Sequence, residues 1–170
     1  MTKGLPRSLR NNLASQAVVK QVIKATALAI SVAGTSGAGW GTAVIGDLPQ
    51  GNILLHGAVS YLQFTSADAD VQATYDGDYS IGTTATADAT LSGTDVNVIP
   101  STALGAATDG VSPVVRGASS GGAVGTVLDN TDGSLELNLN LLVDDANVSG
   151  TADFTATGYI VIAYTVLGDD

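Results

Sequence analysis

The segment SLELNLNLLV, residues 134–143, alternates between leucine and a polar residue over most of its length. Its leucines at one parity are Leu135, Leu137, Leu139 and Leu141, and its polar residues at the other parity are Glu136, Asn138 and Asn140. Successive side chains of a β-strand point to opposite faces, so this pattern predicts a strand with one apolar and one polar face. The apolar face must be covered by another layer, which favours a layered β fold.

The same alternation recurs along the chain. Between residues 26 and 32 the bulky side chains are Thr26, Leu28, Ile30 and Val32, and near the end Phe154, Ile160, Ile162, Tyr164 and Val166 share one parity. Glycine-rich turns separate such segments, and we count about eight strands by these signals. The pattern predicts an all-β, antiparallel β-sandwich. A jelly-roll-like order is preferred to an immunoglobulin order, because this chain has no cysteine.

One predicted strand, within ILLHGAVSYLQFT at residues 53–65, changes its parity. Apolar residues first occupy the odd positions Leu55, Val59 and Tyr61, and then Leu62 and Phe64 occupy the even ones. An extra residue in one strand of an antiparallel pair produces such a switch. We therefore expect a β-bulge near Tyr61.

Charge is distributed very unevenly along the chain. Residues 1–46 contain no acid and five basic residues, which are Lys3, Arg7, Arg10, Lys20 and Lys24. Residues 47–170 contain Arg116 and all 16 acidic residues. An acidic body argues against nucleic acid as a partner, since binding phosphates requires Lys and Arg on the contacting surface. A basic segment on an acidic body indicates docking onto another acidic protein surface, including a second copy of this chain.

These observations divide the chain into a basic N-terminal arm, residues 1–24, and a single β-sandwich domain, residues 25–170. The arm is expected to be extended or to form a short helix, because Val18, Val19, Val22 and Ile23 fall at helical spacing. Its partner-binding residues are predicted to be Lys3, Arg7, Arg10, Val18, Val19, Val22 and Ile23. A secretion signal formed by Lys24, the apolar stretch Ala25–Ala33 and a cleavage site at Ser31–Ala33 is a less favoured interpretation of this part of the chain. Apolar runs are too short to span a bilayer, so no membrane partner is expected.

Residues with catalytic or metal-binding chemistry are few. The chain has one histidine, His56, and Ser119 lies in a GASSG motif that resembles the nucleophile segment of serine hydrolases, but no histidine follows that serine. Acidic pairs such as Asp68 with Asp70 offer oxygen ligands for Ca²⁺, without the spacing of an EF-hand. We expect no enzyme activity, no metal and no cofactor. His56 and the single tryptophan, Trp40, are interpreted as interface residues.

Three runs carry a resemblance to a known family: IGDLPQGNILLHGAVSYLQFT, DGDYSIGTTATADATLSGTDVNVIPSTALGAAT and DGSLELNLNLLVDDANVSGTADFTATGYIVIAYTVLGDD. Together they cover most of residues 45–170 and resemble small virion proteins of tailed bacteriophages, especially marine and cyanobacterial phages. The resemblance implies a capsid decoration, or cement, protein on the capsid exterior. Such a protein would bridge capsomers, with the major capsid protein as partner. The resemblance assigns no role to individual residues.

The resemblance also implies assembly as a homotrimer. A strand face of small residues, Ala27, Ala29 and Ser31, is compatible with the close approach of another copy. The alternative function is a carbohydrate-binding or adhesive module, in a phage fibre or a secreted surface protein. That function would require exposed aromatic rings to stack on sugars.

Overall fold

The computed structural model describes residues 17–35, 38–144 and 147–168, and in these ranges the chain is built from antiparallel strands. The strands are β1 (Val19–Thr35), β2 (Ala38–Asp47), β3 (Gly51–Thr65), β4 (Gly77–Gly82), β5 (Ile99–Ala103), β6 (Val115–Ala118), β7 (Val127–Asn130), β8 (Glu136–Asp144) and β9 (Thr151–Gly168). A short 3-10 helix, η1 (Gly93–Asp95), precedes β5. No helix in the described ranges is long and apolar enough to cross a membrane.

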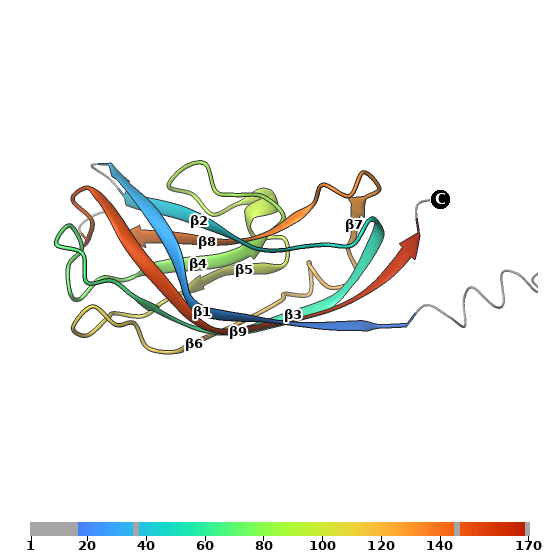
Figure 1. Cartoon of the computed structure of the whole chain (residues 1–170), viewed down its shortest axis with the longest axis horizontal. Helices are drawn as coiled ribbons and strands as arrows, with labels where there is room; N and C mark the ends of the chain where they lie inside the picture. The colour runs from blue at the N-terminus through green and yellow to red at the C-terminus, as the bar shows by residue number, and fades with distance from the viewer. Residues whose placement is uncertain (1–16, 36–37, 145–146, 169–170) are drawn as a thin grey trace, which may run out of the picture.

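The strands form two packed layers (Figure 1). Hydrogen bonds connect all nine strands in the continuous order β5-β4-β8-β2-β1-β9-β3-β6, with β7 paired to β3 beside this path. We call the layer β1-β9-β3-β6 with β7 the first sheet and the layer β2-β8-β4-β5 the second sheet. Strands β1 and β2 pair only near their shared turn, from Val32↔Gly41 to Thr35↔Ala38, and then diverge into different sheets. The first and last strands are neighbours, and the consecutive pairs β1 and β2, β3 and β4, and β8 and β9 are each divided between the two sheets. This order is that of a jelly roll. The predicted all-β, antiparallel, jelly-roll-like sandwich is confirmed.

The core lies between the two sheets. Strand β8 buries Leu137, Leu139 and Leu141 on its inner face, as its alternation predicted. Tyr75 packs edge-on against Phe154, with ring centroids 5.1 Å apart, and its hydroxyl donates a hydrogen bond to the Phe64 carbonyl. Burial raises the pKa of Tyr75 to about 12.

Strand β1 begins at Val19, and not near residue 25. From Val19↔Tyr164 to Ala25↔Gly158 it pairs with β9, so the helix expected as one alternative for residues 18–23 is wrong and these residues are extended. The reason is that β9 offers a long unpaired edge, against which β-branched residues are favoured in a strand. Residues 1–16 of the predicted arm lie outside the described residues.

The bulge in β3 is at His56, and the predicted position near Tyr61 is wrong. The register with β9 shifts between Leu55 and Gly57, so His56 is the extra residue. Beyond it the even positions, Ala58 to Phe64, face the core. The odd residues Val59 and Tyr61 therefore lie on the outer surface of the sheet.

Ser60 faces the core because its hydroxyl has a partner there. Ser60 Oγ lies 2.9 Å from the Tyr79 hydroxyl of β4, and both side chains are fully buried. This hydrogen bond connects the first sheet to the second. Gly117 of β6 lies beside this hydrogen bond, and a Cβ added at Gly117 would press against the Tyr79 hydroxyl and Ser60 Oγ.

The outer faces of the two sheets differ. Asn138 and Asn140 on the outer face of β8 are buried, although the pattern of β8 assigns them to its polar face. The loop at residues 83–97 covers Asn140, whose amide donates to the carbonyls of Thr84 and Asp95 and accepts a hydrogen bond from the Thr86 N–H. The second sheet is thus shielded at this position by the chain itself.

The buried pair between the sheets generates a first prediction. Replacing Tyr79 by Phe leaves the buried Ser60 hydroxyl unpaired and should cost about 1–3 kcal/mol of unfolding free energy. Ser60→Ala should lower the unfolding free energy less in the Tyr79→Phe variant than in the original chain. In that variant the substitution removes a hydroxyl that is already unpaired. Urea denaturation of the four proteins measures the coupling, with Tyr159→Phe, on the outer face, as a near-neutral control. Strictly additive costs would show that the two hydroxyls do not interact.

Candidate functional site

The outer face of the first sheet carries a regular grid of side chains over strands β1, β9, β3 and β6. We call it the cationic face and define it by three rungs, each formed by residues directly opposite one another on neighbouring strands. The rungs comprise Lys24, Tyr159, Tyr61 and Arg116; Val22, Val161, Val59 and Ala118; and Lys20, Ala163 and Gly57. Directly opposite residues on neighbouring strands lie on the same face, so these side chains are neighbours.

The first rung is aromatic at its centre and cationic at both ends. The rings of Tyr61 and Tyr159 lie with centroids 5.2 Å apart at an interplanar angle of 34°. Tyr159 is 44% exposed, a high value for a large aromatic side chain on a sheet. Lys24 is opposite Tyr159, and Arg116 is opposite Tyr61.

The second and third rungs are mostly apolar. Val22 at the edge is 56% exposed, and Val161 and Val59 continue the apolar row inward. A shallow hollow of about 270 Å³ lies over these rungs, and its lining residues are Lys20, Gly57, Ala58, Val59, Val161 and Ala163. Neighbouring exposed apolar groups with a charged rim are typical of protein-binding surfaces.

The charges on this face differ from those of the rest of the chain. Lys20, Lys24 and Arg116 are the basic residues in the described ranges, and all three occupy these rungs. No acidic residue occupies the rungs, although the chain has 16 acids. The face is therefore a local positive region on an acidic protein.

The structure separates the apolar residues of the predicted arm by parity. Val22 points outward into the cationic face, and Val18 beside the strand is also exposed. Val19 and Ile23 share the opposite parity, and Ile23 packs against the core. The predicted cations Lys3, Arg7 and Arg10 lie outside the described residues.

The two predicted interface residues lie apart from each other. Trp40 of β2 is half-buried, opposite Ala33 and Leu142. His56 is exposed in the bulge of β3, and its Nε2 lies 2.8 Å from Thr165 Oγ1. His56 precedes Gly57 of the third rung, so it borders the cationic face, whereas Trp40 lies near the β1–β2 turn. Their interface roles stay predictions.

Ser119 is held by backbone groups. Its hydroxyl donates to the Val98 carbonyl at 2.6 Å and accepts a hydrogen bond from the Ala58 N–H at 2.7 Å. These contacts fasten the end of β6 to β3, and His56 bonds to a different partner. The structure does not join His56 and Ser119 by a hydrogen bond.

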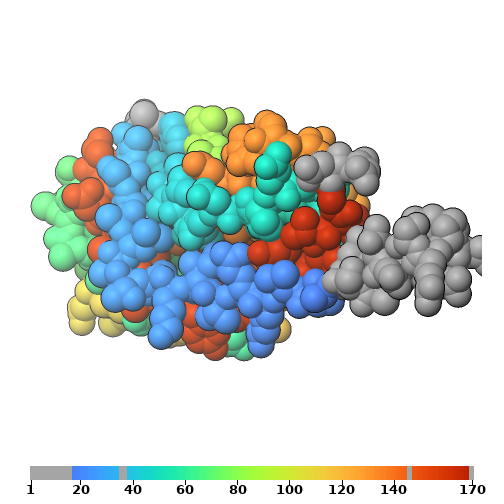
Figure 2. Space-filling model, turned by 45° about the vertical axis from the view of Figure 1, so that its right-hand side comes forward, coloured from blue at the N-terminus to red at the C-terminus, as the bar shows by residue number. Residues whose placement is uncertain are grey.

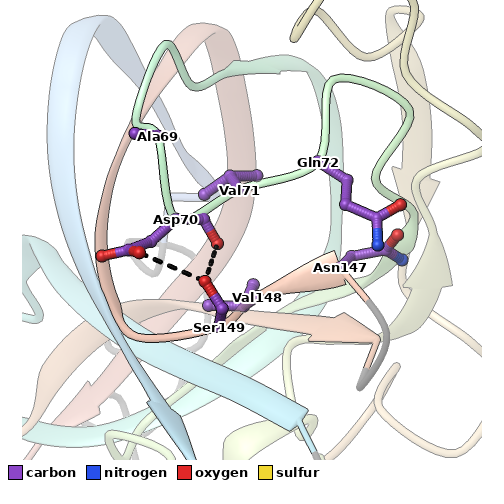
Figure 3. A pocket seen from close by; sticks show the side chains of 7 residues that line it. All are labelled: Ala69, Asp70, Val71, Gln72, Asn147, Val148 and Ser149. Atoms are coloured by element: carbon purple, nitrogen blue, oxygen red, sulfur yellow. Dashed lines mark hydrogen bonds between the residues drawn. The ribbon is translucent and has the colours of Figure 1, made fainter.

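A second hollow, of about 500 Å³, lies elsewhere on the molecule, lined by residues 69–72 and 147–149 (Figure 3). Ser149 Oγ donates to the Asp70 carboxylate at 3.1 Å. Nearby, hydrogen bonds from the N–H groups of Asp70 and Asp153 lower the pKa of Asp68. In the described parts of the chain, no group of three or more His, Cys, Asp and Glu side chains is placed to hold a metal ion.

The residues that sequence reasoning missed as binding candidates are Lys20, Lys24, Val59, Tyr61, Arg116, Tyr159 and Val161. The parity switch in β3 is the sequence signal that could have identified two of them. When the switch is placed at His56, Val59 and Tyr61 lie on the outer surface of the sheet. Arg116 could not be connected to the lysines by local pattern, because β6 reaches them only through β3 and β9.

Comparisons with known proteins leave the family open. No protein-family model matches the chain, and no curated protein matches it. Among solved structures, it is similar to a chain in the structure of the infectious bursal disease virus Gt strain, at 13% identity and a TM-score of 0.37. The alignment covers 88% of this chain and 32% of that chain, so the chain spans about a third of its length.

The acidic side chains generate a prediction of pH dependence. Burial, and then the charges of Asp76 and Asp78, raise the pKa of Asp144 above its ordinary value of 3.8. Its folded pKa therefore exceeds its unfolded pKa, so the ionised group destabilises the fold above the folded pKa. This penalty disappears as the pH falls below the unfolded pKa. Asp144→Asn should increase stability at neutral pH by less than about 1 kcal/mol, because the group is largely exposed to screening solvent.

The gain from Asp144→Asn should shrink as the pH falls toward 3.8, and denaturation at several pH values measures it. Asp132→Asn is the matched control of opposite sign. Hydrogen bonds from the Ser134 N–H and hydroxyl lower the pKa of Asp132, so its loss should destabilise the protein at neutral pH. Equal changes in unfolding free energy for Asp144→Asn and Asp132→Asn would contradict the opposite pKa shifts assigned to these two groups.

Proposed function

We propose that this chain is a structural protein of a virus particle that docks through its cationic face onto an acidic protein surface. In its finer form, the proposal is a capsid decoration or cement protein on the exterior of a tailed-phage head, with the major capsid protein as partner. The observation that carries it is the cationic face: Lys20, Lys24 and Arg116 surround apolar rungs, whereas at Asn140 a loop covers the outer face of the other sheet.

The physical basis of docking is the combination of apolar area and charge. Val22 and Tyr159 are large exposed groups whose burial against a partner is favourable, and Tyr and Arg are residue types enriched at the centres of interfaces. The cations at the ends of the rungs would steer and orient an acidic partner. Since such charges are screened by salt, docking should weaken as ionic strength rises.

The phage assignment has two further supports. The three sequence runs resemble small virion proteins of tailed phages, and the jelly roll is an architecture that viral capsid domains use. The fold alone does not assign function, because lectins and cupins share it. A trimer that bridges capsomers belongs to this proposal, as do the absence of enzyme activity and of a nucleic-acid partner.

The docking proposal predicts a loss of binding when the charge of the face is reversed. Arg116→Glu should lower binding to particles assembled without this chain by about tenfold or more, because it replaces an attraction with a repulsion beside the Tyr61 ring. Co-sedimentation of the full chain with such particles at low and moderate salt measures the loss.

The matched control is Ala87→Asp combined with Ala89→Asp, two exposed positions in the loop over the second sheet, with the same change of two charges. This control should bind as the original chain does. Equal losses in both proteins would indicate a general charge effect and would contradict docking through the cationic face.

A second candidate function is supported by one observation. The neighbouring rings of the exposed Tyr159 and the half-buried Tyr61 offer aromatic surface of the kind that stacks on sugar rings, as a carbohydrate-binding or adhesive module would require. Tyr159→Ala distinguishes the two functions. Loss of binding to a glycan array, with no binding of either protein to particles, would favour the carbohydrate module.

A further inference from the structure

Strand β1 has one edge that no other described strand covers. β9 pairs along one side of β1, from Val19 to Ala33. On the other side, β2 pairs only from Val32 onward, so the edge from Val19 to Ser31 is free of strand partners in the part of the chain that the structure describes. In Figure 2 the blue surface of β1 runs openly along one side of the molecule.

An uncovered edge presents backbone N–H and C=O groups that can pair with another strand. The side chains of Gln21 and Ile23 lie behind this edge near β2, because a Cβ at Gly46 of β2 would lie within 4 Å of both. An added strand would pair with the backbone of the edge in front of these side chains.

The usable part of the edge is short. The register between β1 and β9 shifts between Ala25 and Leu28, and Ala27 has a left-handed φ of 49°. A bulge of this kind bends a strand and interrupts its pairing. A straight added strand therefore fits along Val19–Ala25.

The side chains beside this edge define what the added strand should contain. Lys20, Val22 and Lys24 point to the outer face in the order cation, apolar, cation. In an antiparallel pair the directly opposite residues share a face, and opposite charges or apolar groups stabilise the pairing. The complementary segment has a carboxylate, an apolar residue and a carboxylate at alternate positions.

We propose that the edge of β1 at Val19–Ala25 accepts an extended acidic segment of another protein as an added strand. This inference rests on the proposed function and deepens it, because it names how the acidic partner attaches to the cationic face. Main-chain hydrogen bonds would supply affinity, and Lys20, Val22 and Lys24 would supply selectivity.

Charge disfavours two other occupants. If a second copy paired its β1 antiparallel about Val22, Lys20 of each copy would face Lys24 of the other, and like charges directly opposite are destabilising. The chain's own residues 1–16 carry Lys3, Arg7 and Arg10 and no acid, so they do not complement the lysines either. The competing explanation is that the lysines only protect an edge from aggregation.

The test uses the full chain and a fluorescent peptide of sequence Thr-Glu-Thr-Val-Thr-Glu-Thr with blocked ends. Two further peptides carry N-methyl groups on alternate amides, one set at the odd and the other at the even positions. In strand addition only one set of amides faces β1, so one methylated peptide should lose binding and the other should keep it. Fluorescence polarisation measures the affinities. No binding of the parent peptide, or equal loss with both methylated peptides, would overturn strand addition and leave the lysines as edge protection.

Charge variants complete the test. Lys24→Glu should weaken peptide binding by about tenfold and improve binding of the same peptide with lysine in place of glutamate. The control variant Ala87→Asp combined with Ala89→Asp has the same change in net charge and should leave peptide binding unaltered. The particle assay with Arg116→Glu tests the proposed function separately, so peptide binding without particle docking would reject that function and retain the strand site. Equal weakening by Lys24→Glu and the control would reject the site.

Discussion

The jelly roll depends on the position of β9 between β1 and β3. This strand pairs along nearly its whole length on both sides, so its backbone groups are used in two ladders, and from Thr151 to Tyr164 its side chains alternate between core and surface. Register shifts occur at Ala25/Leu28 in β1, at His56 in β3, and near the end of β9, where Leu167 is the extra residue opposite Asn52/Ile53. Gly158 of β9 has a φ of 145° and no space for a Cβ against the Tyr61 carbonyl of β3. The regular alternation of β9 from Tyr159 to Ala163 gives the cationic face its regular rungs.

The two sheets treat their outer faces differently, and this difference separates stability from binding. On the second sheet, Asn140 is buried with its amide bonded to the loop at residues 83–97, so its polar group is satisfied inside the protein. On the first sheet, Val22 and Tyr159 are left in contact with solvent although their burial would be favourable. A chain that shields part of one face with its own loop and exposes apolar and aromatic groups on the other is asymmetric in a way that suits attachment by one side.

Much of the fold was accessible from sequence because period-two patterns are local. The leucines of β8 and the residues of β9 at Ile160 and Ile162 face the core as predicted. The helix expected at residues 18–23 was wrong for a geometric reason: positions four apart, such as Val18 and Val22, share a face in a helix and in a strand alike. The predicted position of the bulge in β3 is wrong because the sequence pattern treats Val59 and Tyr61 as core residues. The residue that faces the core between them is Ser60, whose hydroxyl forms a hydrogen bond with Tyr79 of a distant strand. Neither the hydrogen bond nor the meeting of Arg116 with the lysines has a local sequence signal.

The lysines of β1 affect both which strand can pair with its open edge and whether that edge pairs with a second copy of the chain. An open strand edge attracts any extended segment through its backbone, so its side chains must discriminate among the segments that approach. Two positive charges on one face of the edge oppose a second copy of β1 in the antiparallel register about Val22 and oppose other basic segments. The same charges favour a strand with carboxylates opposite them. Because Lys20 and Lys24 flank an exposed valine, the discrimination does not remove apolar attraction for the segment that matches. One alternation of charge and apolar surface would therefore serve both protection from self-association and the proposed recognition of an acidic partner.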